Sequence, residues 1–198
     1  MTAPIAKARI ALFGGTFDPP HLGHLEMAKR AREIAALDEV IFIPCRQSPH
    51  KSARPTAEDH HRLAMLERAT HDLPWATVSK IELDRPDPSY SWQTAETFSL
   101  SNPEADLFWI LGHDQWQSID SWAEPDKLRS LLTFIVCARE HRQGDPRDGF
   151  RARFVDFHHP ASASTIRERL AAGDPSSATA LLPSEVAAYI ADQGLYQP

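Results

Sequence analysis

The chain has 198 residues, a formal net charge of −6 at pH 7 and a hydrophobic content of 42%. This length and composition are typical of one globular domain with a substantial core, and the negative charge argues against broad binding to nucleic acid or to an anionic membrane. No apolar run approaches the ~18 residues of a membrane span, and residues 1–9 lack the apolar core of a signal peptide, so we expect a cytoplasmic protein.

The first predicted elements are a strand and a helix joined by a turn rich in glycine and proline. Residues 10–13 are wholly apolar, which is typical of a buried parallel strand. Residues 25–36 predict a helix, because small and apolar side chains recur there at three- and four-residue spacing. The expected buried face consists of Leu25, Ala28, Ala31, Ile34 and Ala35.

The turn between them, residues 14–24, has features suited to an anion. Gly14 and Gly15 allow close backbone approach, and the first turn of a helix offers unpaired N–H groups and the positive end of the helix dipole. His21 and His24 lie three residues apart and can each donate to a phosphate oxygen. The alternative is an ordinary turn in which His24 caps the helix and His21 lies on the surface. We interpret the stretch as a phosphate-binding turn.

The remaining elements are predicted in chain order from the same signals. They are a strand at 39–44, a polar loop at 45–55, a helix from 56 to about 72, a strand at 76–83, a loop at 84–91, a helix at 92–100, strands at 106–111, 131–138 and 150–157, and helices at 164–172 and 184–193. Thr56 is expected to cap its helix, and Gly173 and Gly194 to end the last two.

Alternating strands and helices predict an α/β fold with a doubly wound, mainly parallel sheet of five to six strands and helices on both faces. We treat residues 1–198 as a single domain whose C-terminal end, about 160–198, is helical. In such sheets ligands bind beyond the carboxyl ends of the strands. His21 and His24 follow the first strand, His50 and Lys51 the second, and Asp114 the fourth. Their convergence predicts an active site at that edge.

A second helix start resembles the first in its chemistry. Ser162 and Ser164 bring hydroxyls to the start of the helix at 164–172, and Arg167, one turn in, could fork across two phosphate oxygens. The alternative is a serine N-cap with Arg167 paired to Glu140 or another surface acid. The presence of two such helix starts in one chain favours a polyphosphate ligand.

Several aromatic and acidic residues have two interpretations each. Asp114 could orient a ribose hydroxyl or cap the following helix, and Trp116 and Trp122 could stack on a flat ring or fill the core. Tyr90 and Ser91 are similarly ambiguous.

Two adjacent histidine pairs, at 60–61 and 158–159, are expected on the surface rather than at a metal. Adjacent histidines seldom chelate one ion, and no acid or thiolate at matching spacing accompanies them. We therefore predict no metal site made by the protein.

The motifs together resemble those of the bacterial nicotinate-nucleotide adenylyltransferases, within the nucleotidyltransferase superfamily that carries the HxGH signature. The signature is present as His21-Leu22-Gly23-His24, and the supporting pieces are Pro49-His50-Lys51, Pro88-Ser89-Tyr90-Ser91, Ile110 to Asp114 with Trp122 beyond it, Ser162 to Arg167, and the ending from Leu182 to Tyr196. They span nearly the whole chain.

The resemblance implies a Rossmann-like fold and an enzyme of NAD biosynthesis that joins ATP and nicotinic acid mononucleotide into deamido-NAD and releases pyrophosphate. It implies catalytic roles for His21, His24 and Arg167. The implied ATP-binding residues are Gly14, Gly15, Thr16, Phe17, His21, His24, Ser162, Ser164, Ile166 and Arg167. The implied acceptor-binding residues are Asp18, His50, Lys51, Tyr90, Ser91, Asp114 and Trp122, with His50 and Lys51 completing the phosphate cage.

Two departures from the family pattern concern ring positioning. Ser91 and Ser164 stand where the family usually has threonine, so the hydroxyl is kept but the stiff β-branched methyl is lost. His113 fills a variable position and receives no role.

The expected chemistry is in-line attack of a 5′-phosphate oxygen on the α-phosphorus of ATP, with Mg²⁺ delivered by ATP. The alternatives are another acceptor, such as nicotinamide mononucleotide or phosphopantetheine, and an inactive nucleotide-binding regulatory module. The expected partners are small molecules, with neither nucleic acid nor membrane, and self-association stays open.

Overall fold

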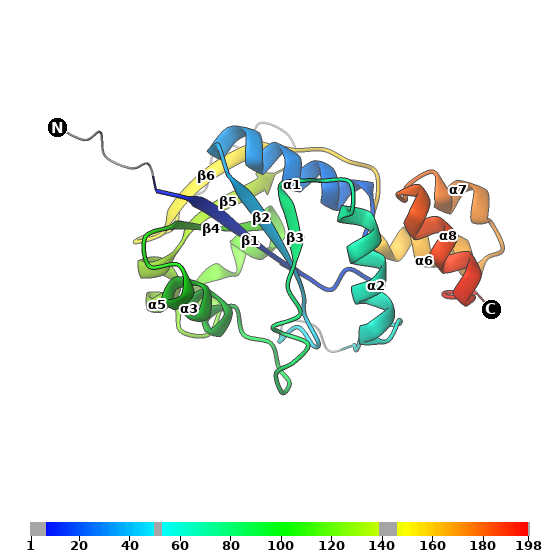
Figure 1. The fold of residues 1–198 in the computed structure, drawn as a ribbon, viewed down its shortest axis with the longest axis horizontal. Coiled ribbons are helices and arrows are strands. Elements are labelled where there is room, and N and C mark those ends of the chain that lie inside the picture. Colours follow the sequence, from blue (N-terminus) through cyan, green and yellow to red (C-terminus); the bar gives the residue numbers. More distant parts are fainter. Residues whose placement is uncertain (1–6, 50–52, 139–145, 198) are drawn as a thin grey trace.

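Short apolar segments form the strands of a parallel sheet at the centre of the molecule (Figure 1). The structure, a computed structural model, describes residues 7–49, 53–138 and 146–197. The strands are β1 (Arg9–Gly15), β2 (Glu39–Pro44), β3 (Ala76–Val78), β4 (Asp106–Gly112), β5 (Thr133–Ala138) and β6 (Arg151–Asp156). The six-stranded sheet has the order β3-β2-β1-β4-β5-β6, and every pair in it is parallel. The predicted α/β class is confirmed.

Helices cover both faces of the sheet. They are α1 (Leu22–Ala35), α2 (Asp59–Thr70), α3 (Ser91–Ser101), α4 (His113–Gln117), α5 (Pro125–Leu131), α6 (Ala163–Ala171), α7 (Pro175–Thr179) and α8 (Ser184–Gln193). The last three gather beside α2 at one end of the molecule (Figure 1). Among the described residues, the structure contains no helix whose length and apolar character would suit a membrane crossing.

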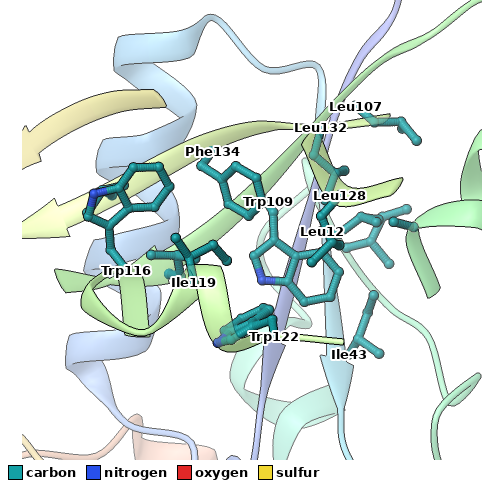
Figure 2. Packing of buried hydrophobic residues seen from close by; sticks show 14 of the residues in the cluster. Leu12, Ile43, Leu107, Trp109, Trp116, Ile119, Trp122, Leu128, Leu132 and Phe134 are labelled. Carbon is teal, nitrogen blue, oxygen red and sulfur yellow. The ribbon is translucent and has the colours of Figure 1, made fainter. Parts of the chain in front are cut away.

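The two faces of the sheet have separate cores because neighbouring residues of a strand point to opposite sides. On one face Leu12 lies in register with Ile41 and Trp109, under α3, α4 and α5. Figure 2 shows the tryptophans of this face packed among leucine and isoleucine side chains. On the other face Ala28 and Ala31 of α1 pack against the sheet. The core therefore holds β1 and β4 rigidly at its centre.

Helix α1 differs from its prediction at its start and in its buried face. It begins at Leu22 because His21 takes the N-cap position. Its buried residues are Gly23, Ala28, Ala31 and Ala35, whereas Ile34, which we expected in the core, is 50% exposed. Small side chains suffice for this contact because they let the helix axis approach the sheet closely.

The second helix and third strand are shorter than predicted. Helix α2 begins at Asp59 with Glu58 at its N-cap, so Thr56 is not the cap. The N–H groups of Thr56 and Ala57 instead donate to the Asp18 carboxylate, at 2.7 and 3.0 Å, which holds this segment outside the helix. Strand β3 ends at Val78, because the chain turns between residues 81 and 83.

Three short α-helices were absent from the prediction, of which one is α4, directly after β4. Residues 125–131 form α5, which begins with Pro125 at its first position, so the fifth strand starts at Thr133 rather than at 131. Helix α7 begins after Asp174, whose carboxylate accepts from Ser177 N–H at 3.2 Å. Each is less than two turns long, which is too short for apolar periodicity to reveal. The predicted end of α8 at Gly194 is confirmed, with φ of 61°.

Candidate active site

The candidate site lies where the order of the strands reverses. From β1 the chain proceeds to β2 and β3 on one side, and from β4 to β5 and β6 on the other, so β1 and β4 are neighbours at the centre. The loops that follow neighbouring strands diverge at such a point and leave a crevice beyond their carboxyl ends. The turn after β1 and the start of α4 after β4 both open into it.

The two glycines at the end of β1 are required by packing. A Cβ on Gly14 would lie 2.8 Å from the Trp109 ring, and one on Gly15 would lie 3.0 Å from the Phe17 ring. Phe17 itself has φ of 49° and is 1% exposed, with its ring centroid 4.9 Å from that of His24. The turn is therefore held by aromatic side chains on its inner side, and Phe17 lies in the core rather than at the surface of a cavity.

His21 and His24 form a stacked pair at the start of α1. Their ring centroids are 3.7 Å apart with an interplanar angle of 25°. The His21 backbone N–H donates to His24 Nδ1 at 3.2 Å, so a neutral His24 ring carries its proton on Nε2. His21 is 7% exposed, and burial, followed by the nearby His159, lowers the pKa of His21 to about 4. At neutral pH His21 is therefore an uncharged imidazole.

Two cavities meet at His24. The first, which we name the Trp122 cavity, is lined by residues that include Gly14, Gly15, Thr16, Ser91, Trp109 and Trp122. The second, the His21 cavity, is lined by residues that include His21, Gly23, His113, Phe157 and His159. Both are also lined by His24, Met27, Gly112 and Asp114. A group bound in one cavity is thus separated from a group bound in the other by His24 and Asp114.

Asp114 reaches this shared wall because Gly112 leaves room for it. A Cβ on Gly112 would lie 2.7 Å from the Asp114 carboxylate. Gly112 occupies the N-cap of α4 and no side chain makes a capping hydrogen bond there, so the capping alternative for Asp114 does not hold. Its carboxylate is exposed and faces both cavities, as a contact to a ribose would require.

The tryptophans have different environments. Trp122 lines the Trp122 cavity and stands edge-to-face with Trp109, with ring centroids 6.5 Å apart. Tyr90, Ser91 and Trp122 line an adjoining cavity. Trp116 is fully buried, 5.7 Å from the Phe134 ring, and belongs to the core (Figure 2). Of the two tryptophans predicted to stack on a ligand or fill the core, only Trp122 lines a cavity in which a ligand could bind.

Asp18, predicted to bind the acceptor nucleotide, is 3% exposed and lines neither cavity. Its carboxylate accepts from Thr56 N–H, Ala57 N–H and the Tyr196 hydroxyl, the last at 2.7 Å. Burial and the adjacent Asp18 carboxylate raise the pKa of Tyr196. The structure therefore gives Asp18 a tethering role between distant segments. The spacing of the signature could not reveal this, since Tyr196 lies at the far end of the chain.

Several polar groups at the start of α6 are bound within the protein. Ser162 Oγ accepts from Thr165 N–H at 3.2 Å and lies 3.1 Å from Ser164 Oγ. Arg167 Nη1 donates to the Asp18 carbonyl oxygen at 2.6 Å and lies 3.9 Å from its carboxylate, so the acid that Arg167 pairs with is Asp18. Ile166 is fully buried and its N–H donates to Ser162 O. None of the four predicted ATP-binding residues of this segment, Ser162, Ser164, Ile166 and Arg167, lines the His21 cavity. Ala161, directly before them, does line it.

His159 and Glu82 line the cavities but were not predicted to do so. The expectation of a surface position for the 158–159 pair is wrong for His159, which faces the His21 cavity, because the segment after β6 bends toward α1. Glu82 is 4% exposed and lines the Trp122 cavity, and its burial raises the pKa of its carboxyl group. A single histidine or glutamate in a loop carries no spacing signal. The predicted His50 and Lys51 lie outside the described residues.

Comparison with known proteins gives the same family. The family model described as cytidylyltransferase-like matches residues 12–169. The probable nicotinate-nucleotide adenylyltransferase of Bacillus pumilus (strain SAFR-032) is 38% identical over 192 residues, which cover 96% of this chain and 98% of that protein. The nicotinate-nucleotide adenylyltransferase of Bacillus subtilis (strain 168) is 34% identical over 196 residues, with 96% and 98% covered.

A solved structure shares the fold over nearly the same length. It is the Plasmodium falciparum nicotinic acid mononucleotide adenylyltransferase complexed with NaAD, with a TM-score of 0.78, 22% identity, and 96% of this chain and 97% of that chain covered. Because a family model matches most of the chain and full-length relatives exceed 30% identity, the chain belongs to the cytidylyltransferase-like family and, within it, to the nicotinate-nucleotide adenylyltransferases.

Proposed function

We propose that this protein transfers the adenylyl group of ATP to the 5′-phosphate of nicotinic acid mononucleotide, forming deamido-NAD and releasing pyrophosphate. The observation that carries the proposal is that His24, stacked on His21, lies at the wall shared by two cavities, at the reversal point of the sheet. Two nucleotide substrates bound on either side of that wall would bring their phosphates together there. The names of the full-length relatives support the identity of both substrates.

In this proposal ATP occupies the His21 cavity and the acceptor nucleotide the Trp122 cavity. Trp122 offers a ring face or edge to a pyridine ring, and Ser91 offers a hydroxyl. Asp114, which faces both cavities, would accept a hydrogen bond from a ribose hydroxyl. The resemblance assigns Gly14, Gly15 and Thr16 to ATP, whereas they line the Trp122 cavity, where they would approach the acceptor phosphate.

The chemistry needs positioning and charge neutralisation rather than a base. The acceptor phosphate is already ionised at neutral pH and attacks the α-phosphorus in line as pyrophosphate leaves. Donors from His24 and from the start of α1 would stabilise the negative charge that develops on the transferred phosphoryl group. His21, being uncharged, would donate one hydrogen bond without adding a full charge.

Mg²⁺ would enter as part of the ATP substrate. Among the residues that the structure describes, no group of three or more histidine, cysteine, aspartate or glutamate side chains is placed to hold an ion. Asp114, which lines both cavities, would make at most a single contact, and the other ligands would be phosphate oxygens and water, which suits Mg²⁺.

The proposal is tested by pyrophosphate release from MgATP with each of three acceptors. We expect rapid release with nicotinic acid mononucleotide and slower release with nicotinamide mononucleotide or phosphopantetheine. A faster reaction with either of the other acceptors would reassign the substrate. ATP binding with no release from any acceptor would instead support a nucleotide-binding regulatory module.

A further inference from the structure

The segment between β6 and α6, residues 157–161, lies over the first turn of α1. Phe157 N–H donates to Ala138 O at 2.8 Å, so the segment leaves the sheet beside the end of β5. It then carries His159 into the lining of the His21 cavity, with the His159 ring stacked parallel to that of Phe157 at an interplanar angle of 10°. A residue far along the chain from the HxGH signature thus lies at its side.

His159 approaches the backbone of α1 as closely as His21 does. A Cβ on Gly23 would lie 3.2 Å from His159 Nδ1 and 3.0 Å from His21 Nδ1, so Gly23 leaves the room that both imidazoles occupy. The nearby His159 is also the second cause of the low pKa of His21. Three imidazoles, from His21, His24 and His159, therefore surround one helix start.

The orientation of the His159 ring is set by a backbone hydrogen bond. Ala161 N–H donates to His159 Nδ1 at 3.1 Å. Because Nδ1 accepts, the neutral ring carries its proton on Nε2, which becomes a hydrogen-bond donor. The hydrogen bond from Ala161 N–H orients this donor before any ligand binds.

We propose that His159 is a third phosphate-binding imidazole of this site, whose Nε2–H donates to a phosphate oxygen of the bound triphosphate beside His21. The inference rests on the proposed function, which assigns the His21 cavity to ATP. The cavity is lined by four histidines, and Asp114 is the one acid among its described lining residues, so it favours an anion. The positive end of the α1 helix dipole favours the same negative charge.

Two substitutions separate ligand binding from a purely structural role. In His159→Asn the amide lies near the place of Nδ1 and can accept the Ala161 N–H as an Asx turn, but the Nε2 donor is lost. In His159→Gln the amide NH₂ lies near the place of Nε2, so the donor is kept and the backbone contact is lost. His158→Asn is the matched control, because His158 is the exposed neighbour and lies outside the cavity.

The measurement is the dissociation constant of ATP in the presence of Mg²⁺, determined by calorimetry without acceptor. We expect an increase of about tenfold for His159→Asn, since the lost hydrogen bond is to a charged group. We expect a smaller increase for His159→Gln and no change for His158→Asn. Adenosine, which has no phosphate, should bind all four proteins equally.

Three results would overturn the proposal. They are an unchanged ATP affinity in His159→Asn, a larger loss in His159→Gln than in His159→Asn, and an equal loss for adenosine and ATP. The first places His159 away from the ligand, the second makes it structural, and the third places it at the nucleoside. A wild-type protein that binds MgATP but releases no pyrophosphate with nicotinic acid mononucleotide would refute the proposed function and leave this measurement intact.

Discussion

The first turns of α1 and α6 have similar sequence signals but different surroundings. At α1, His21 is buried, His24 faces two cavities, and the rings stack on each other. At α6, the Ser162 hydroxyl already accepts from Thr165 N–H, and Arg167 is bound to Asp18. The two starts differ in their side chains, because the histidines of α1 line cavities, whereas Ser162 and Arg167 of α6 are bound within the protein and would have to exchange partners to reach a ligand. A polar helix start is therefore a ligand site only where tertiary packing leaves its donors facing a cavity.

The largest expected effect comes from His24 at the α1 start. We expect His24→Ala to lower kcat by about 10²-fold or more with a small change in the KM of ATP, because a donor to the transferred phosphoryl group matters most in the transition state. Steady-state pyrophosphate release measures both constants. His60→Asn, at an exposed histidine outside both cavities, is the control. Near-normal turnover of His24→Ala would contradict the proposal that the start of α1, unlike that of α6, contacts the transferred phosphoryl group.

Asp18 connects the two helix starts, since it precedes α1 and binds Arg167 of α6. We expect Asp18→Ala to lower the free energy of unfolding by about 3 kcal/mol, because it removes a buried acceptor from two backbone N–H groups and from Tyr196. Urea denaturation measures the change. Tyr196→Phe, which removes one donor, should cost about half as much. A loss below ~1 kcal/mol for Asp18→Ala would show that the tether contributes little.

The burial of His21 predicts a pH dependence that α6 lacks. Its pKa in the folded state is about 4 against 6.5 for an ordinary histidine, so the unfolded chain binds a proton that the folded chain does not. Protonation of His21 therefore costs the folded state nothing above pH 6.5, and stability is lost as the pH falls below that value, by about 2–3 kcal/mol near pH 4.

Urea denaturation of the wild type and of His21→Asn at neutral pH and near pH 4 measures this contribution. The wild type should lose more stability than the variant over that interval. Parallel losses in the two proteins would show that His21 protonates freely in the folded state.

The smallest expected effect is at the α6 start. Ser162→Ala should lower the free energy of unfolding by about 1 kcal/mol, since the N-cap hydroxyl is lost, and Ser164→Ala, at an exposed position, by less than ~0.5 kcal/mol. Thermal unfolding measures both. If Ser162→Ala weakened ATP binding without affecting stability, the α6 start would already be a ligand site like that of α1.

The sequence predicted the positions of helices and strands better than it predicted the contacts between side chains that are distant in the chain. The apolar runs at 39–44 and 106–111 match β2 and β4 closely, and Gly194 marks the end of α8 as predicted. These features depend on residues within one or two turns of each other. Helices α5 and α7 were missed because a segment of five to seven residues contains too few periods to read.

What the sequence by itself determined is the α/β fold class, the phosphate-suited helix start at His21 and His24, and the family. Only the tertiary structure decided which polar side chains from distant parts of the chain lie close together. Asp18 meets Tyr196, and His159 meets His21, although each pair is separated by most of the chain. The physical reason is that local conformation follows from neighbouring residues, whereas these meetings depend on the order of the strands and on where the last helices pack. The spacing of residues in the sequence indicates neither the order of the strands nor the packing of the last helices.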